Sequence, residues 1–334
     1  MSKQTLYPLT FSPQLRHYIW GGRNLERLFG RNLPPGITAE SWEISGHPTA
    51  PTAADNGPLA GQTLPQILAR WGEALVGSQA GWALQRDKFP LLVKLLDANQ
   101  NLSVQVHPDD AYGLAHEGGE LGKTEMWYIL QAKPGAQIIF GLKPGLTKQT
   151  FHRALTNGQL ENWLHYLPVQ AGQAIFVDSG SIHALLAGVV VAEIQQNSDT
   201  TYRVYDWGRL GQDGQPRQLH IDKALAVTNF NQIEPGPYQP QLISSRAGLT
   251  RLEISRCPYF VVEQITFTAG AIYQGHTDGR SLEIWGTVAG HGQLRWAGGQ
   301  IDLPAIRFGL IPAGLGDFTI TAAGPGTMLR TYLP

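Results

Sequence analysis

The chain has 334 residues, of which 42% are hydrophobic; this supports one to three globular domains and excludes a disordered polypeptide. The formal net charge of −1, with acidic and basic residues interspersed, excludes a broad field that would attract nucleic acid or an anionic membrane. Cys257 is the only cysteine, which excludes an intrachain disulfide and a thiolate zinc cluster and fits a reducing compartment.

The N-terminal stretch MSKQTLYPLTFSPQ has no apolar core followed by a cleavage site. No window reaches the ~18 apolar residues that span a bilayer. We therefore expect a cytoplasmic protein with neither a membrane nor a nucleic-acid partner. Glycine and proline are abundant, at 39 and 22 residues, which favours many short strands joined by turns over a helical bundle.

Two alternating segments concentrate metal-ligating side chains: LSVQVHPDD at residues 102–110 and GKTEMWYIL at residues 122–130. Residues two apart in an extended strand share a face. On this basis, one strand presents Ser103, Gln105 and His107 together, and the next presents Lys123, Glu125 and Trp127. Neighbouring strands of this kind would bring a glutamine, a histidine and a glutamate to one point.

Three segments have helical patterns, at residues 63–76, 147–166 and 222–230. In the second, Asn157-Gly158 predicts a division into two short helices. A further ligand segment, FVDSGSIHAL at residues 176–185, contains a glycine turn that delivers His183. The second helical segment is therefore predicted to be an insertion that packs on a sheet.

A single histidine such as His107 is commonly a hydrogen-bonded core residue. Two histidines, a glutamate and an amide oxygen together suit zinc, iron or manganese, and the absence of thiolate favours an open catalytic site. We therefore predict that the metal ligands are Gln105, His107, Glu125 and His183.

These segments, together with FPLLVKLLDA at residues 89–98 and EIQQNSDTTYRVYDW at residues 193–207, resemble type I phosphomannose isomerase, a zinc-dependent enzyme of the cupin superfamily. The resemblance begins at FSPQLRHYIWGG, residues 11–22, and follows the order and spacing of the short bacterial form. In one departure, the chain has Asp178 where the family usually has proline before the third ligand. Loss of that proline is expected to loosen the turn.

The resemblance implies a mainly β fold, with two cupin-like jelly-roll barrels and a small helical insertion at about residues 147–166. The proline-rich stretch at residues 231–242 predicts a boundary, so we expect a catalytic cupin domain at 1–235 and a cupin-like β domain without metal at 236–334. IPAGLGDF at residues 311–318 resembles VDSGSIHA at residues 177–184, which puts Asp317 in the position of His183. His276 and Asp278 are either a remnant site or, as we favour, a surface turn.

The resemblance also implies site residues. Lys94, Ser103 and Lys123 would bind the substrate, and Arg203, Lys123 and Glu193 would be the catalytic candidates. Arg203 would stabilise an enediolate. Its place on the strand face, not the resemblance, makes Glu193 a candidate base or hydrogen-bond relay. Glu193, Lys123 or a metal-bound water would shuttle the proton, and the sequence does not assign the base. From the pattern alone, Lys94 could equally pair with Asp97, Arg203 could be a surface charge, and Glu193 could pair with an arginine.

The implied activity is zinc-dependent interconversion of mannose 6-phosphate and fructose 6-phosphate, an aldose–ketose isomerisation through an enediol or enediolate. One Zn²⁺ per chain, a phosphosugar substrate and a monomer or weak homodimer are expected. An iron-dependent cupin oxygenase and a non-catalytic sugar-phosphate-binding cupin remain alternatives. A nucleotide-binding loop at GGELGKT is excluded because the position five residues before Gly122 is Glu117 rather than glycine.

Overall fold

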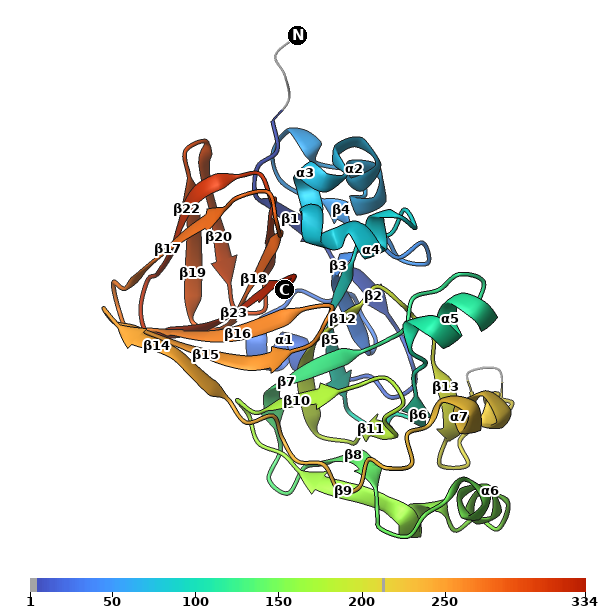
Figure 1. Cartoon of the computed structure of the whole chain (residues 1–334). Coiled ribbons are helices and arrows are strands. Elements are labelled where there is room, and N and C mark those ends of the chain that lie inside the picture. The colour runs from blue at the N-terminus through green and yellow to red at the C-terminus, as the bar shows by residue number, and fades with distance from the viewer. Residues whose placement is uncertain (1–4, 212–213) are drawn as a thin grey trace. The chain divides into compact units, whose positions relative to one another are not determined.

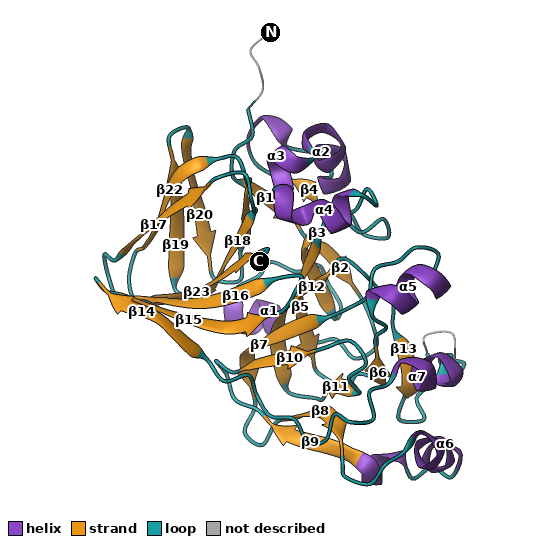
Figure 2. Ribbon diagram, in the orientation of Figure 1, coloured by secondary structure: helices purple, strands orange, loops and turns teal. Residues whose placement is uncertain are grey.

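The structure, a computed structural model, describes residues 5–211 and 214–334. It is mainly β, with strands in four antiparallel sheets and short helices between them (Figures 1 and 2), which confirms the predicted fold class. The described residues group into two compact units. One contains the residues up to Gln14, Trp42–Val93 and Gln239–Pro334, and the other contains Leu15–Ser41 and Lys94–Tyr238. Division into functional domains at 1–235 and 236–334 remains a prediction.

Eight consecutive strands form what we call the first barrel: β5 (Leu91–Ala98), β6 (Val104–Val106), β7 (Glu125–Ala132), β8 (Gln137–Leu142), β9 (Leu164–Pro168), β10 (Ala174–Val177), β11 (His183–Leu185) and β12 (Val189–Gln196). They lie in two sheets, in the orders β10-β7-β12-β5 and β6-β11-β8-β9. Further strands extend these sheets: β2 (Gln14–Arg16), β3 (Glu40–Ser45) and β13 (Tyr202–Tyr205).

Another eight strands form the second barrel: β16 (Val261–Phe267), β17 (Ile272–Thr277), β18 (Glu283–Ala289), β19 (His291–Trp296), β20 (Gly299–Pro304), β21 (Phe308–Ile311), β22 (Gly316–Ala322) and β23 (Gly326–Tyr332). Their orders, β21-β18-β23-β16 and β17-β22-β19-β20, repeat the first barrel strand for strand. The sheet that contains β18 is extended by β1 (Leu9–Ser12), β4 (Ala53–Ala54), β14 (Gln241–Arg246) and β15 (Leu249–Arg256).

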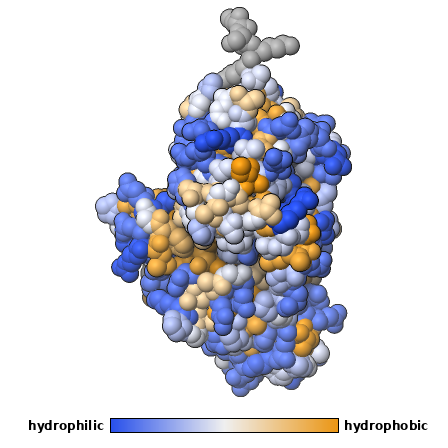
Figure 3. Space-filling model, turned by 90° about the vertical axis from the view of Figure 1, so that its left-hand side faces the viewer, coloured by the Kyte–Doolittle hydropathy of each residue, from blue (hydrophilic) through white to orange (hydrophobic). Residues whose placement is uncertain are grey.

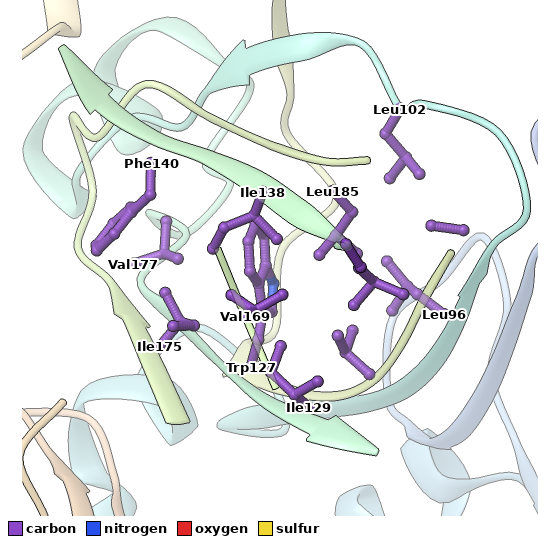
Figure 4. Packing of buried hydrophobic residues seen from close by; sticks show 14 of the residues in the cluster. Leu96, Leu102, Trp127, Ile129, Ile138, Phe140, Val169, Ile175, Val177 and Leu185 are labelled. Carbon is purple, nitrogen blue, oxygen red and sulfur yellow. The ribbon is translucent and has the colours of Figure 1, made fainter. Parts of the chain in front are cut away.

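Apolar side chains from facing strands fill the first barrel. Trp127, Ile138 and Val177 belong to a buried cluster and point toward one another in Figure 4. Strand β5 is buried along its whole length, because its apolar run has protein on both faces. Lys94 lies inside this run, so its charge requires compensation within the protein.

The strand correspondence supports the predicted alignment of the two barrels and adds to it. Gln105 pairs with His183 across β6 and β11, and His276 pairs with Asp317 across β17 and β22. His276-Thr277-Asp278 is therefore the topological counterpart of Gln105-Val106-His107, a relation that the sequence pattern did not reveal. Both His276 and Asp278 are exposed. Asp278 follows β17, but His276 belongs to that strand, so the prediction of a surface turn is wrong for His276.

Glu283 at the start of β18 corresponds to Glu125 at the start of β7, but its environment differs. Trp285 Nε1 donates to Glu283 Oε2 over 2.7 Å, and Arg330 donates to both Glu283 and Glu263. Because Arg330 occupies β23 at the position that Glu193 holds on β12, a partly buried guanidinium compensates Glu283 and, together with Arg251, Glu263.

The helices only partly follow the prediction. Residues 63–76 form α2 (Leu64–Trp71) and α3 (Glu73–Val76), separated by Gly72 at φ 45°, and α7 spans Ile221–Val227. The division at Asn157-Gly158 is confirmed, since α6 (Lys148–Thr156) ends there and η3 (Leu160–Trp163) follows. The helical prediction is wrong for residues 164–166, which pair with β8 as part of β9.

Several short helical elements were not predicted: α1 (Asn24–Phe29), η1 (Gly57–Leu59), η2 (Ser78–Ala80), α4 (Gly81–Leu84) and α5 (Asp110–His116). Helix α5 begins after Asp109, whose side chain caps it by accepting from Tyr112 N. Among the described residues, no helix is long and apolar enough to cross a membrane. On the face shown in Figure 3, hydrophobic and hydrophilic side chains are interspersed.

Replacing Arg330 should test the internal charge compensation of the second barrel. Arg330→Met would leave buried Glu283 without its cation, whereas Glu263 would keep its pair with Arg251, and we expect a loss of about 3–5 kcal/mol in the free energy of unfolding. Urea denaturation measures this loss. The matched control is Arg280→Gln, which removes an exposed pair with Asp278 and should cost roughly 0–1 kcal/mol. Equal effects of the two substitutions would contradict the proposed compensation.

Candidate metal and substrate site

Three predicted metal ligands meet inside the first barrel. Glu125 begins β7, His183 begins β11, and His107 directly follows β6. One donor atom from each of the three lies within 4.8 Å of the others, and all three residues are buried. Among the described residues, this is the group of histidine and carboxylate side chains with the arrangement needed to hold a metal ion.

Backbone carbonyls orient both histidines. His107 Nδ1 lies 2.9 Å from Thr200 O, and His183 Nδ1 lies 2.9 Å from Ser181 O, so each Nδ1–H donates to a carbonyl. In a neutral imidazole this leaves Nε2 with its lone pair. The Nε2 atoms lie 3.6 Å and 3.4 Å from Glu125 oxygens. Both rings therefore direct a lone pair toward the same carboxylate.

The histidines are held in the neutral form. Burial lowers the pKa of His183 to about 4. Burial, with the charge of Lys123, holds the pKa of His107 well below its ordinary value. Neutral imidazoles are the form that coordinates metal ions.

Glu125 is fully buried, and neither of its oxygens accepts a hydrogen bond of good geometry within the described part of the chain. Lys123 Nζ nevertheless lies 3.0 Å from Glu125 Oε2 and 3.1 Å from His107 Nε2. A buried carboxylate without hydrogen bonds is costly unless a cation compensates it. The surroundings of Glu125 thus favour positive charge at this point.

Gln105 lies beside the three ligands. It pairs with His183 on one side and with Arg203 of β13 on the other, and its amide nitrogen is 3.3 Å from His183 Nε2. A half-turn of the amide would present Oε1 at that point instead, because the two ends have nearly the same shape. Ser103 Oγ is 3.5 Å from the opposite end of the amide.

The turn before His183 is closed without the proline of the family pattern. Ser181 N donates to Asp178 O over 3.1 Å, and Gly180 N donates to His107 O over 2.9 Å. Gly180 has φ 86°, a conformation that favours glycine. Thr124 Oγ1 also donates to Asp178 Oδ1, so hydrogen bonds hold the turn that the sequence suggested would be loose.

A cavity of about 280 Å³ lies beside this group. The cavity is lined by every predicted substrate-binding and catalytic residue: Lys94, Ser103, Lys123, Glu193 and Arg203, together with Gln105. Side chains that the sequence did not single out for the site also line it: Tyr18, Glu40, Asp199, Thr201 and Arg217. Trp20 lines the cavity as well.

Lys94 is compensated by three carboxylates instead of by Asp97. Its Nζ lies 3.7–3.8 Å from oxygens of Glu40, Glu193 and Asp199. Burial lowers the pKa of Lys94, but the three carboxylates outweigh this effect and raise it above the ordinary value. Lys94 is therefore a protonated ammonium. Asp97 instead accepts from the backbone and side chain of Asn24.

Glu193 has one oxygen fixed and the other directed elsewhere. Trp127 Nε1 donates to Oε2 over 3.0 Å, whereas Oε1 accepts no hydrogen bond from the described residues and lies 3.7 Å from Lys94 Nζ. Burial and the charge of Glu125 raise the pKa of Glu193. A raised pKa makes a carboxylate a stronger base.

Arg203 is half-buried, and its Nη1 donates to Gln218 O over 2.8 Å. Its Nε is buried without a hydrogen-bond partner among the described residues. Burial and the positive charges of Arg217 and Arg209 lower the pKa of Arg203, although the guanidinium remains charged. The prediction that it is an ordinary surface charge does not describe this environment.

Comparison with known proteins identifies relatives over nearly the whole chain. Residues 9–128 match the family model for the catalytic domain of type I phosphomannose isomerase. "Probable mannose-6-phosphate isomerase GmuF" of Bacillus subtilis is 38% identical over 314 residues, covering 94% of this chain and 96% of the relative. The chain belongs to the type I mannose-6-phosphate isomerase family.

Two further mannose-6-phosphate isomerases are similar to this chain over most of its length. The mannose-6-phosphate isomerase of Streptococcus mutans is 40% identical over 255 residues, 76% of this chain and 77% of that protein. The crystal structure of the mannose 6-phosphate isomerase from Bacillus subtilis superposes with a TM-score of 0.88 at 35% identity, covering 98% and 99% of the two chains. Membership in this isomerase family confirms the resemblance seen in the sequence.

The residues that were missed carry no pattern by which sequence alone could find them. Arg217 lies in an irregular segment, and neither Asp199 nor Glu40 belongs to a spaced cluster of ligand types. Trp42 does not line the cavity; it packs at 0% exposure with Ala50 and Leu92.

Asp206 should contribute stability that depends on pH. Burial raises its pKa, but hydrogen bonds from Arg217 and Arg209 outweigh this and lower it below the ordinary value. The contribution is therefore present above the unfolded-state pKa of about 3.9 and is lost as the pH falls through the folded-state pKa. We expect Asp206→Asn to lose about 1–3 kcal/mol at pH 7.

Urea denaturation of both proteins at several pH values measures this difference. The two stabilities should converge as the pH falls below the unfolded-state pKa of about 3.9 and through the lower folded-state pKa of Asp206, where the wild-type carboxyl becomes protonated. A difference that stays constant through the acid range would show that the ion pairs of Asp206 are not its cause.

Proposed function

We propose that this chain is a zinc-dependent aldose–ketose isomerase that interconverts mannose 6-phosphate and fructose 6-phosphate through an enediol or enediolate. One observation carries the proposal: a buried set of two histidines and a glutamate adjoins a polar cavity lined by four cationic side chains. The first group suits a divalent cation, and the second suits a phosphorylated sugar.

The residues present fit a zinc ion. Both Nε2 lone pairs face Glu125, whose buried oxygens accept no hydrogen bond of good geometry within the described residues, and no thiolate takes part. His107, Glu125 and His183 would hold the ion, with Gln105 Oε1 as the fourth protein ligand. One ion per chain follows from this single set. When bound, zinc supplies Lewis-acid polarisation of the sugar's carbonyl and hydroxyl oxygens.

The chain's own residues would bind and orient the sugar. Ser103 Oγ and the Lys94 ammonium line the cavity and can donate to sugar oxygens. Arg203 is the cross-strand neighbour of Gln105, which places a fixed positive charge beside the ligand set. We assign Arg203 to stabilising negative charge on the oxygens of the open-chain sugar while the proton is away from carbon.

Two groups are suited to move the proton between C2 and C1. Glu193 Oε1 is a carboxylate oxygen in the cavity wall with no hydrogen bond from the described residues, and burial makes it more basic. Lys123 Nζ lies beside the ligand set and can return a proton to a sugar oxygen. Glu193 is therefore the candidate base and Lys123 the candidate acid.

The proposal includes the protein's setting. With one cysteine in the whole sequence and a phosphosugar as substrate, we assign the enzyme to the cytoplasm. We further propose that it acts as a monomer or a weak homodimer.

Metal removal and restoration tests the proposed function. Fructose 6-phosphate formation from mannose 6-phosphate should fall to background after chelation and return when zinc is added, because the proposal assigns polarisation of the sugar oxygens to the bound zinc. A coupled assay follows the reaction. A folded, zinc-loaded protein that shows no turnover would refute the isomerase assignment.

Replacing one ligand tests the site itself. His107→Ala should lose bound zinc and at least about 100-fold in turnover, since it removes a nitrogen donor from a buried set. Zinc content by mass spectrometry and turnover are measured on the same preparation. His152→Ala, on the exposed side of α6, is the matched control and should retain both. Full zinc occupancy in the His107 variant would contradict the ligand assignment.

A further inference from the structure

The charges that line the cavity are distributed unevenly. Lys94 is surrounded by Glu40, Glu193 and Asp199, each within 3.8 Å. Lys123 forms a pair with Glu125. The protein's own carboxylates therefore offset the charge of both lysines.

The arginines have the opposite balance. Arg203 and Arg217 line the cavity. Arg209 is close enough for its positive charge to lower the pKa of Arg203. Asp206 is the carboxylate that pairs with Arg209 and Arg217. Three guanidinium groups and one carboxylate sum to +2. A phosphate monoester carries about −1.5 to −2 charges at pH 7, so this corner complements it.

Arg217 is also fixed in place. Its Nε donates to Asp206 Oδ2 over 2.8 Å and its Nη2 donates to Asp206 Oδ1, which holds the plane of the guanidinium. Its Nη1 makes no hydrogen bond to the residues that the structure describes. A guanidinium oriented by a carboxylate on one side can donate to an anion on the other.

The segment that carries Asp206 is anchored next to the cavity. Trp207 Nε1 donates to Leu102 O over 2.7 Å, and Arg209 Nη1 donates to Asn101 O over 2.5 Å. Ser103, a cavity residue, follows directly in the chain. These bonds fix Asp206, which holds Arg217, relative to the segment that carries Ser103. A preorganised clamp loses less entropy when it binds its ligand.

We propose that Arg217, held in place by Asp206, binds the phosphate group of the substrate in this cavity. The inference rests on the proposed function and deepens it, because it names the group that distinguishes a phosphorylated sugar from a neutral one. Arg203 is the cross-strand neighbour of Gln105, and we assign it to the reacting carbons. Lys94 then orders the carboxylates around it and donates to sugar hydroxyls.

The test compares zinc-loaded wild type with Arg217→Gln. The KM for mannose 6-phosphate and the inhibition constant of inorganic phosphate should both rise about tenfold or more, since a charge-assisted hydrogen bond is lost. The kcat should stay within about threefold, and zinc content should be unchanged. For Arg217→Lys, the KM and the inhibition constant should lie between those of wild type and Arg217→Gln, because lysine keeps the charge but lacks the planar guanidinium.

Arg280→Gln is the matched control: it removes one positive charge from an exposed arginine that does not line this cavity, and should leave both constants unchanged. Unchanged KM and phosphate inhibition in Arg217→Gln would overturn the inference, as would a fall in kcat alone. If Arg217→Gln fails to fold, Arg217→Lys decides by the same two constants.

The inference and the proposed function fail separately. An active wild type with an unaffected Arg217 variant refutes only the phosphate assignment. If the wild type is inactive, the isomerase proposal fails, and calorimetric titration of inorganic phosphate into wild type and Arg217→Gln still tests the binding role directly. Equal affinity of the two proteins would then overturn it.

Discussion

Burial of charge inside a β-barrel is the constraint on which this structure depends. Glu125 has no solvent contact, and Lys94, Lys123 and Glu193 are nearly as enclosed. In such surroundings an uncompensated charge costs several kcal/mol, so each group must face an opposite charge or a metal ion. The position of almost every polar side chain in the first barrel follows from that requirement.

The two barrels meet the same requirement in different ways. They share strand order and a Glu-x-Trp sequence at the start of the equivalent strand, in which Glu125 and Glu283 correspond. In the second barrel Arg330 supplies a fixed guanidinium and hydrogen-bonds both neighbouring glutamates. In the first barrel the corresponding position on β12 is Glu193, which adds negative charge. With a glutamate in place of the arginine, the first barrel is suited to bind a cation from solution, whereas Arg330 is the cation of the second barrel.

The sequence was sufficient where pattern and chemistry coincide. Strand alternation put Gln105 and His107 on one face, and a glycine turn brought His183 to them across β11. The sequence was insufficient where no local pattern indicates the structure that forms. Leu164 continues a helical periodicity, yet it joins β9 because β8 offers an unpaired edge, a tertiary effect that no local signal contains.

The charge partners of the site were equally beyond the sequence. Nothing near Lys94 in the chain indicates Glu40 or Asp199, which lie 54 and 105 positions away along the sequence and meet it only in the folded barrel. Arg217 is held at the cavity by the hydrogen bonds that it donates to Asp206. Asp206 itself lies in an irregular segment after β13. The spacing of candidate metal ligands is a local pattern and can be predicted from the sequence. The partners that compensate a buried charge depend on the whole fold and cannot.

Unequal compensation also gives the cavity a direction. A ligand with a dianion at one end and hydroxyl groups along its length would lower its energy by placing the dianion against the arginines and its hydroxyls against the carboxylates around Lys94. Reversal would bring like charges together. Gln105 and Arg203 are neighbours across β6 and β13, so the charge of Arg203 lies beside the ligand set. If the phosphate binds Arg217 as proposed, its binding energy would hold the sugar in the cavity in one orientation relative to this set.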